Sequence, residues 1–206
     1  MNKEDFAGRL PGLIGEGQFI QYAVLAPLLE TPGGIALLYE KRTVKLKSQP
    51  GEISFPGGKH EPGETLRRCA VRETTEELLI QPRKIEVLGP GDIFISPFNF
   101  MVHTFIGTIS NYQNTFSLDE VDEIITVPLS FFRDNEPEKF QSSLVFEPPE
   151  DFPYERIPGG ENYPWKNGTF DILFYQYQDH IIWGMTALIT VSVLRLIEQY
   201  NLVDLA

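Results

Sequence analysis

The sequence is short of cysteine, of basic residues and of long apolar runs. Its one cysteine, Cys69, excludes an internal disulfide, and we expect a protein of a reducing, cytoplasmic setting. Only 17 Lys and Arg residues face 29 Asp and Glu residues, and the formal net charge of −12 disfavours nucleic acid and anionic membrane surfaces as partners. The longest apolar run, 181–194, is about 14 residues long and too short to span a bilayer. The N-terminus also lacks the apolar core of a secretory signal.

Two common kinds of site also lack support. The three histidines, His60, His103 and His180, are scattered and do not have metal-site spacing, so we expect structural or solvent-exposed roles for them. No Ser-His-Asp or Cys-His arrangement is visible, and Cys69 is expected to be a small core residue rather than a nucleophile. The chain shows no internal repeat, and its 206 residues suit a single domain, 1–206.

Apolar periodicity and turn residues predict many strands and two clear helices. The helices are expected at 65–79 and 186–200, with a shorter one at the end of 120–132. Residues 1–18 predict an irregular lead-in, and 111–119 a polar loop. Strands are expected at 20–29, 35–40, 84–88, 92–95, 101–109, the first part of 120–132, 140–146, 171–177 and 180–183.

The stretch 57–80 is the most informative part of the chain. Glu73, Glu76 and Glu77 are spaced so that they share one face of the predicted helix. The same sector carries apolar residues, including Leu66 and Ala70. Because like charges repel at this spacing and burying them unpaired is costly, we expect a cation beside them. Clustered carboxylate oxygens favour a hard divalent ion such as Mg²⁺ or Mn²⁺.

The alternative for such a pattern is a solvated acidic patch. Three features argue against it here. The glutamates share a sector with apolar residues, Arg72 stands four residues before Glu76 and can steady it, and a glycine turn at Gly57 and Gly58 precedes the helix.

This turn and helix resemble the signature of the Nudix hydrolases. Gly58 is followed after five residues by Glu64, after seven more by Arg72-Glu73, and after two more by Glu76-Glu77. Thr74 stands where the family usually has an aliphatic residue, and Leu79 where it usually has glycine, which predicts a changed helix exit. The resemblance implies an α/β fold, the α/β/α sandwich with a mixed sheet, and a Mg²⁺- or Mn²⁺-dependent pyrophosphatase acting on nucleoside diphosphate derivatives.

The same resemblance suggests roles for the acidic residues. Glu73 and Glu77 are expected to be the primary metal ligands, and Glu76 to bind a second ion or orient its water. The Gly58 carbonyl can add a ligand because adjacent glycines allow close backbone approach. Glu64 is expected to support the metal site.

The predicted catalytic residues are Glu76, Glu120 and Arg72. Arg72 is expected to hold the glutamates by charge-assisted hydrogen bonds. Members of the family often take a further glutamate, as a ligand or a general base, from the region that corresponds to 120–132. Glu120 and Glu123 are both candidates, and Glu120 is favoured because it lies closer to the loop. The alternative is a solvated strand entrance.

The segment 41–58 carries a cluster of cations in an otherwise acidic chain. Its run of Arg42, Thr43, Lys47, Gly51 and Phe55 resembles the motif of the coenzyme A pyrophosphatase branch. That motif commonly has serine or alanine in place of Thr43 and arginine in place of Lys47, and lysine loses the bidentate fork of arginine. Arg42, Lys47, Gly51 and Phe55 are the predicted substrate-binding residues. A solubilising charged loop is the alternative.

The leading hypothesis is therefore hydrolysis of coenzyme A or an acyl derivative, a small-molecule partner. A broader nucleoside diphosphate hydrolase and a non-catalytic nucleotide sensor are the alternatives, and a homodimer is one assembly that the sequence permits. The loop 147–169 is rich in proline and aromatic residues. It is expected to cap the core or to line the pocket, with Tyr154, Tyr163 or Trp165 stacking on adenine.

Overall fold

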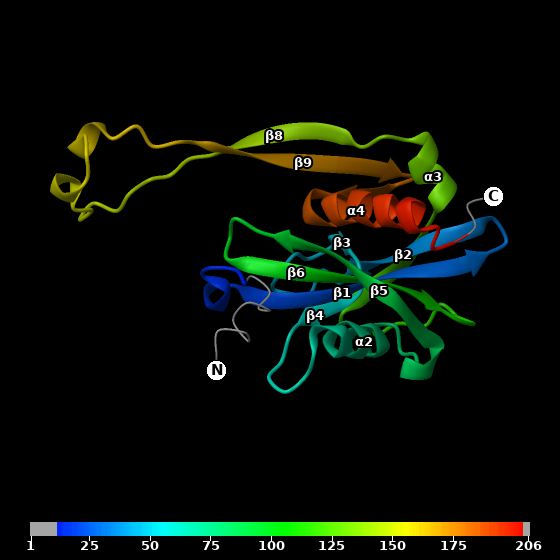
Figure 1. The fold of residues 1–206 in the computed structure, drawn as a ribbon. Coiled ribbons are helices and arrows are strands. Elements are labelled where there is room, and N and C mark those ends of the chain that lie inside the picture. The colour runs from blue at the N-terminus through cyan, green and yellow to red at the C-terminus, as the bar shows by residue number, and fades with distance from the viewer. Residues whose placement is uncertain (1–11, 204–206) are drawn as a thin grey trace, which may run out of the picture.

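The computed structural model describes residues 12–203 and places helices on both faces of a mixed sheet (Figure 1). The predicted α/β/α layering is thus confirmed. Residues 1–11 of the predicted lead-in lie outside the described residues. The main elements are β1 (Ile20–Thr31), β2 (Gly34–Arg42), β3 (Ile53–Ser54), β4 (Gly57–Lys59), α2 (Leu66–Glu77), β5 (Ile85–Ile95), β6 (Phe100–Ile109), β7 (Val121–Pro128), α3 (Leu129–Asp134), β8 (Glu138–Leu144), β9 (Gly168–Tyr177), β10 (His180–Trp183) and α4 (Gly184–Tyr200). Short 3₁₀ turns are η1 (Glu16–Gln18), η2 (Pro82–Lys84), η3 (Tyr154–Arg156) and η4 (Gly160–Asn162).

The large sheet has seven strands, five of them in the order β3-β2-β1-β6-β5. Strands β1 and β6 are parallel, and the other pairs are antiparallel. The second half of β1 pairs with β2, whereas its first half pairs with β4. Strand β3 pairs with the end of β2, so the segment 53–59 connects the end of β2 to the start of β1.

The two strands expected at 84–88 and 92–95 are one strand, β5. Its pairing with β6 shifts register at Val87/Gly89 and again at Pro90/Ile93. Strand β5 lies at the edge of the sheet, where a proline does not remove a hydrogen bond that a second neighbour needs. The prediction of a break was wrong because Gly89-Pro90-Gly91 forms an irregularity within the strand rather than a turn.

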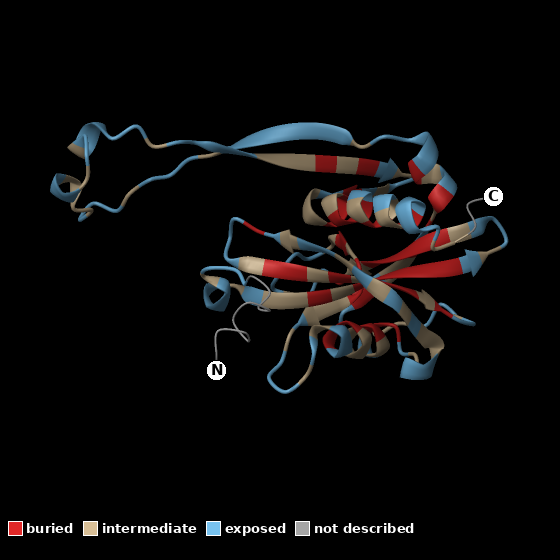
Figure 2. Cartoon of the chain, in the orientation of Figure 1, coloured by how far each residue is buried: buried red, intermediate tan, exposed pale blue. Residues whose placement is uncertain are grey.

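Helix α4 covers one face of the sheet and is buried against it, as expected for the apolar run in the sequence. Its inward side chains Ala187, Ile189, Val193 and Ile197 are at most 5% exposed and pack in the largest apolar cluster. Figure 2 shows the buried residues concentrated on α4 and the central strands. Within residues 12–203, no helix combines the length and the apolar character needed to cross a membrane.

Helix α2 covers the opposite face and confirms the helix predicted at 65–79. It begins after Thr65, whose hydroxyl accepts a hydrogen bond from the backbone N–H of Arg68 at 3.2 Å, which satisfies one of the free donors of the first turn. Cys69 and Ala70 are fully buried, so Cys69 is the small core residue that was predicted. Buried Thr74 donates its hydroxyl proton to the carbonyl of Ala70 at 2.7 Å, and its polar atom is therefore satisfied.

The end of α2 keeps the backbone conformation that a glycine would favour. Leu79 has a φ of 51°, in the left-handed region that side chains with a Cβ avoid. The N–H of Ile80 returns to the carbonyl of Thr75 at 3.2 Å, as in a glycine-type helix end. The predicted change of helix exit is therefore absent from the backbone, and Leu79 holds a conformation that costs free energy.

A second sheet of three strands, β8, β9 and β10, lies over α4 and extends as an arm beyond the body (Figure 1). Strand β8 begins two residues before the predicted 140–146, and β9 and β10 form the predicted hairpin. The arm ends in the loop 147–169, whose rings pack on one another, as in the pairs Phe152–Trp165 and Tyr163–Trp165. The loop lies at the end of the arm, far from the core that it was expected to cap (Figure 1). Its aromatic residues are partly buried by contacts with each other instead.

Candidate active site

The glycine turn before α2 lets the backbone approach two glutamates closely. The N–H of Gly57 donates to Glu77 Oε2 at 2.8 Å. A Cβ on Gly58 would overlap the Glu73 carboxylate, and one on Gly57 would overlap the backbone of Ala23 and Val24. Only glycine fits at position 57, whereas a Cβ at position 58 would displace the Glu73 carboxylate from its place. The carboxylates of α2 consequently lie directly against the turn.

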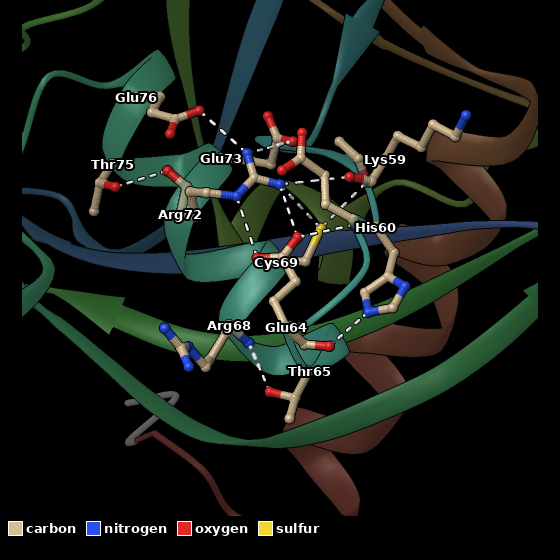
Figure 3. Close-up of polar contacts among 12 residues, drawn as sticks. Lys59, His60, Glu64, Thr65, Arg68, Cys69, Arg72, Glu73, Thr75 and Glu76 are labelled. Carbon is tan, nitrogen blue, oxygen red and sulfur yellow. Dashed lines mark hydrogen bonds and ion pairs between the residues drawn. The ribbon is translucent and has the colours of Figure 1, made fainter.

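Arg72 is the cation that holds the glutamates of the helix (Figure 3). It donates to both carboxylate oxygens of Glu64, at 2.9 and 3.2 Å, and forms ion pairs with Glu73 at 2.9 Å and Glu76 at 3.2 Å. Its hydrogen bonds lower the pKa of Glu64 to about 2. Both oxygens of Glu64 are engaged by Arg72, so this carboxylate stands as a support of Arg72 rather than as a free ligand.

Two carboxylates are buried behind this network, and one of them was not anticipated. Glu77 is 2% exposed and Glu40, from β2, is fully buried. The two are close enough that each affects the pKa of the other. Burial is the main cause that raises the pKa of both carboxyls, and the charge of Glu40 raises that of Glu77 further.

The end of β2 contains most of the unsatisfied buried polar atoms in the described part of the chain. Of four such side-chain atoms, three belong to Glu40, Arg42 and Thr43, and the fourth to Thr104. They comprise an acceptor, Glu40 Oε2, a donor, Arg42 Nε, and a hydroxyl that can act as either. Because proteins rarely leave buried polar groups unpaired, this end of β2 has the character of a binding site for a ligand with charges of both signs.

The structure separates the two candidate glutamates that follow the polar loop. Glu120 is close to the acidic cluster. Burial is the main cause that raises the pKa of Glu73 and Glu77, and the negative charge of Glu120 contributes to the same rise. Its backbone carbonyl accepts from the N–H of Thr43 at 2.9 Å. Glu123 instead pairs with His180 at 3.3 Å, away from the cluster.

The loop 111–119 helps to place Glu120. It caps the end of α2, since the N–H of Ser117 donates to the carbonyl of Glu77 at 2.7 Å and the Thr115 hydroxyl to that of Leu78 at 2.7 Å. No periodic pattern predicts this contact, because a loop that satisfies helix carbonyls needs no regular sequence pattern.

The residues predicted to bind substrate are only partly brought together. Arg42 lies beside Glu40. The N–H of Gly51 donates to the carbonyl of Arg42 at 3.0 Å. Lys47 is exposed in the loop between β2 and β3. Phe55 is 3% exposed and stacks on Tyr39 with a centroid distance of 4.6 Å. It therefore packs in the core, where its ring is not free to contact a substrate.

The histidines make separate local contacts and do not converge. His60 contacts the carbonyl of Glu64 at 2.8 Å, His103 contacts the Gln21 side chain at 2.6 Å, and His180 pairs with Glu123. Burial raises the pKa of the Cys69 thiol to about 12, which makes it a poor nucleophile.

The donor set suits a hard divalent cation, although it is not arranged around one. Among residues 12–203, no group of three or more His, Cys, Asp or Glu side chains forms a ready-made ion site. The Glu73 carboxylate forms an ion pair with Arg72, and the Glu77 carboxylate accepts a hydrogen bond from the N–H of Gly57. The available donors are carboxylate and carbonyl oxygens, which Mg²⁺ and Mn²⁺ prefer, and the unpartnered Glu40 Oε2 lies among them.

Comparison with known proteins gives a consistent result. The family model of the NUDIX domain matches residues 20–146, more than half of the chain. Over 114 residues the chain is 36% identical to the mouse peroxisomal coenzyme A diphosphatase NUDT7, covering 54% of this chain and 48% of that protein. It is 30% identical over 169 residues to the uncharacterized Nudix hydrolase NudL of Photorhabdus laumondii, covering 81% and 79% of the two chains. The chain spans about half the length of the first curated relatives it matches.

Among solved structures, one similar chain is the Nudix hydrolase RenU from M. smegmatis. It is 22% identical, with a TM-score of 0.47, and the match covers 56% of this chain and 74% of that one. This likeness is too low to bear on the activity.

Proposed function

The chain belongs to the Nudix family, whose hydrolases act on pyrophosphate bonds, and on this premise we propose that its substrate is coenzyme A or an acyl-coenzyme A. Hydrolysis would give 4′-phosphopantetheine, or its acyl form, and adenosine 3′,5′-bisphosphate. Nudix hydrolases generally need a divalent cation such as Mg²⁺ or Mn²⁺, and the same requirement is proposed here.

The observation that carries the proposal is the set of unpartnered polar atoms at the end of β2. Glu40 Oε2 and Arg42 Nε are buried without partners in neighbouring positions. An acceptor needs a cation or a proton donor, whereas a guanidinium needs an anion. A pyrophosphate bound together with a divalent cation supplies both.

The choice of coenzyme A rests on the loop between β2 and β3. Arg42 and Gly51 match the motif of the coenzyme A branch, and Lys47 keeps the positive charge of the arginine that is common at its position. The backbone hydrogen bond from Gly51 to Arg42 folds this loop back on the strand. Exposed Lys47 is free to reach a further phosphate of the substrate. The mouse relative named above is a coenzyme A diphosphatase, which supports the same substrate.

Glu73 and Glu77 are the proposed cation ligands, with Glu76 at the exposed end of the cluster and the Gly58 carbonyl beside them. When bound, the cation would neutralise charge on the pyrophosphate and activate water. Arg72 keeps Glu73 and Glu76 positioned through its ion pairs. Arg42 would bind the phosphate oxygens that gain charge as the bridging bond breaks.

Glu120 is the proposed general base. As water attacks one phosphorus, a new P–O bond forms, the bridging P–O bond breaks, and the water gives up a proton. Glu120 is exposed and lies by the buried acids, so it can take that proton and release it to solvent.

The direct test is a product assay over a panel of substrates with Mg²⁺ or Mn²⁺. We expect kcat/KM for coenzyme A or an acyl-coenzyme A to exceed that for ADP-ribose, dinucleotides and nucleoside triphosphates. Faster cleavage of ADP-ribose or a dinucleotide would favour the runner-up, a broader nucleoside diphosphate hydrolase that uses Arg42 and Lys47 as a general phosphate contact. Binding without turnover of any substrate would favour a nucleotide sensor.

A homodimer and a cytoplasmic location, both expected from the sequence, stay predictions, as does the single-domain organisation of 1–206.

A further inference from the structure

We propose that Glu40 is an additional ligand of the divalent cation, contributed by strand β2 rather than by the glycine-helix motif. The inference rests on the proposed function, because it concerns the cation of that site. It assigns a role to a residue that lies outside the spacing pattern of 57–80 and that no sequence motif selects.

The first argument is the cost of placing this carboxylate where it lies. Glu40 is fully buried, and its only hydroxyl donor, Ser54, is at the long distance of 3.4 Å from Oε1. Its Oε2 has no partner. A buried and poorly hydrogen-bonded carboxylate is strongly unfavourable, so the ionised form of Glu40 needs a compensating positive charge.

The second argument is direction. Side chains alternate across a strand, and β2 follows this rule: Leu37 and Tyr39 belong to the core on the α4 face, whereas Leu38 packs with Leu78 on the α2 face. Glu40 therefore points to the α2 face, on which the buried carboxylate of Glu77 also lies, and the two are close enough to affect each other's pKa. When both carboxyls are ionised they are acceptors only, so they cannot satisfy one another, and a cation between them would satisfy both.

The competing explanation is that Glu40 orients Arg42 for substrate. The charge of Arg42 does favour the ionised form of Glu40, since it lowers the pKa of this carboxyl against the effect of burial. However, the buried Arg42 Nε has no hydrogen-bond partner, and therefore does not donate to Glu40. This arrangement leaves Glu40 available to a cation, and Arg42 to an anion.

The experiment measures Mn²⁺ binding to the full chain without substrate, by isothermal titration calorimetry, for the wild type, Glu40→Gln and the control Glu86→Gln. Glu86 is an exposed residue of β5, so its substitution removes the same charge away from the cluster. We expect the Kd for Mn²⁺ to rise at least about tenfold in Glu40→Gln and less than about twofold in the control, since direct ligands contribute far more than distant charges. Melting temperatures with and without Mn²⁺ check folding, and the cation-induced increase should shrink only in Glu40→Gln.

Each outcome decides the inference. Unchanged Mn²⁺ affinity in a folded Glu40→Gln variant would overturn it. A raised KM for coenzyme A with unchanged Mn²⁺ affinity would overturn it in favour of Arg42 orientation. If Glu40→Gln does not fold, Glu40→Asp, which keeps the charge but shortens the reach, must weaken Mn²⁺ binding for the inference to stand. A wild type that binds no Mn²⁺ would instead remove the proposed function itself.

Discussion

Tyr39 and Glu40 are neighbours in β2 but face opposite sides of the sheet, and their environments differ in kind. On the α4 face, the Tyr39 hydroxyl and Thr190 Oγ1 lie 2.9 Å apart, and Thr190 donates to the carbonyl of Thr186 at 2.8 Å. On the α2 face, Glu40 Oε2 is buried without a partner. The buried hydroxyl of Tyr39 is therefore satisfied within the protein, whereas the buried carboxylate of Glu40 is not.

This difference separates stability from binding. The α4 face carries the largest apolar cluster, including Val193 and Ile197, whose burial favours folding. The α2 face has two small apolar clusters and the buried acids Glu40 and Glu77, whose repulsion opposes folding. A ligand that neutralises these acids recovers that cost on binding. Substitutions on the α2 face should therefore lower activity without lowering stability, and substitutions on the α4 face should lower stability without lowering activity.

The largest effect is expected for Glu77→Gln on the α2 face. The amide keeps an oxygen that can accept from the N–H of Gly57 but loses the charge of a proposed cation ligand. We expect kcat to fall about 1000-fold, the upper range for losing one electrostatic contact at a reacting centre, while the cation-free protein stays at least as stable as the wild type. Steady-state kinetics and urea unfolding test this, with Glu86→Gln as the control. Wild-type turnover in the variant would contradict the assignment of Glu77.

The opposite signature is expected for Ile197→Ala on the α4 face. Ile197 is 1% exposed, and removing such a side chain from a packed core costs about 2–5 kcal/mol of unfolding free energy. Because Ile197 packs on the face away from the acids, kcat below the melting transition should stay within about twofold of the wild type. Val191→Ala, at a position 38% exposed on the same helix, should cost much less. A large loss of kcat in folded Ile197→Ala would mean that the two faces are coupled.

Much of the α2 face could be predicted from the sequence, because its signal is local. The spacing of Glu73, Glu76 and Glu77 fixes their common helix face, and Arg72 lies within reach at the same spacing. Glu40 could not be found this way. Its meeting with Glu77 depends on the pairing of β2 with β3 at Glu40 and Ser54 and on the packing of α2, which no local pattern encodes.

Two errors arose where tertiary contacts override local signals. Gly89-Pro90-Gly91 resembles a turn, but pairing with β6 carries β5 through it with two shifts of register. The aromatic residues of 147–169 indicated burial, and rings such as Phe152 and Trp165 do pack closely. They pack on each other at the end of the arm, and composition cannot distinguish such a cluster from the cap of a core.

The smallest effect is expected at the end of α2, where Leu79 has a φ of 51°. A side chain with a Cβ pays about 1–2 kcal/mol in this conformation, whereas glycine avoids this strain but loses more entropy on folding. Leu79 is 61% exposed, so little packing is lost, and we expect Leu79→Gly to raise the unfolding free energy by about 0.5–1 kcal/mol. Leu79→Ala, which keeps the Cβ, should give no such gain in urea unfolding. An equal gain from both variants would show that the exposed leucine chain, rather than the backbone, is the unfavourable element at the exit of the helix that carries the acids.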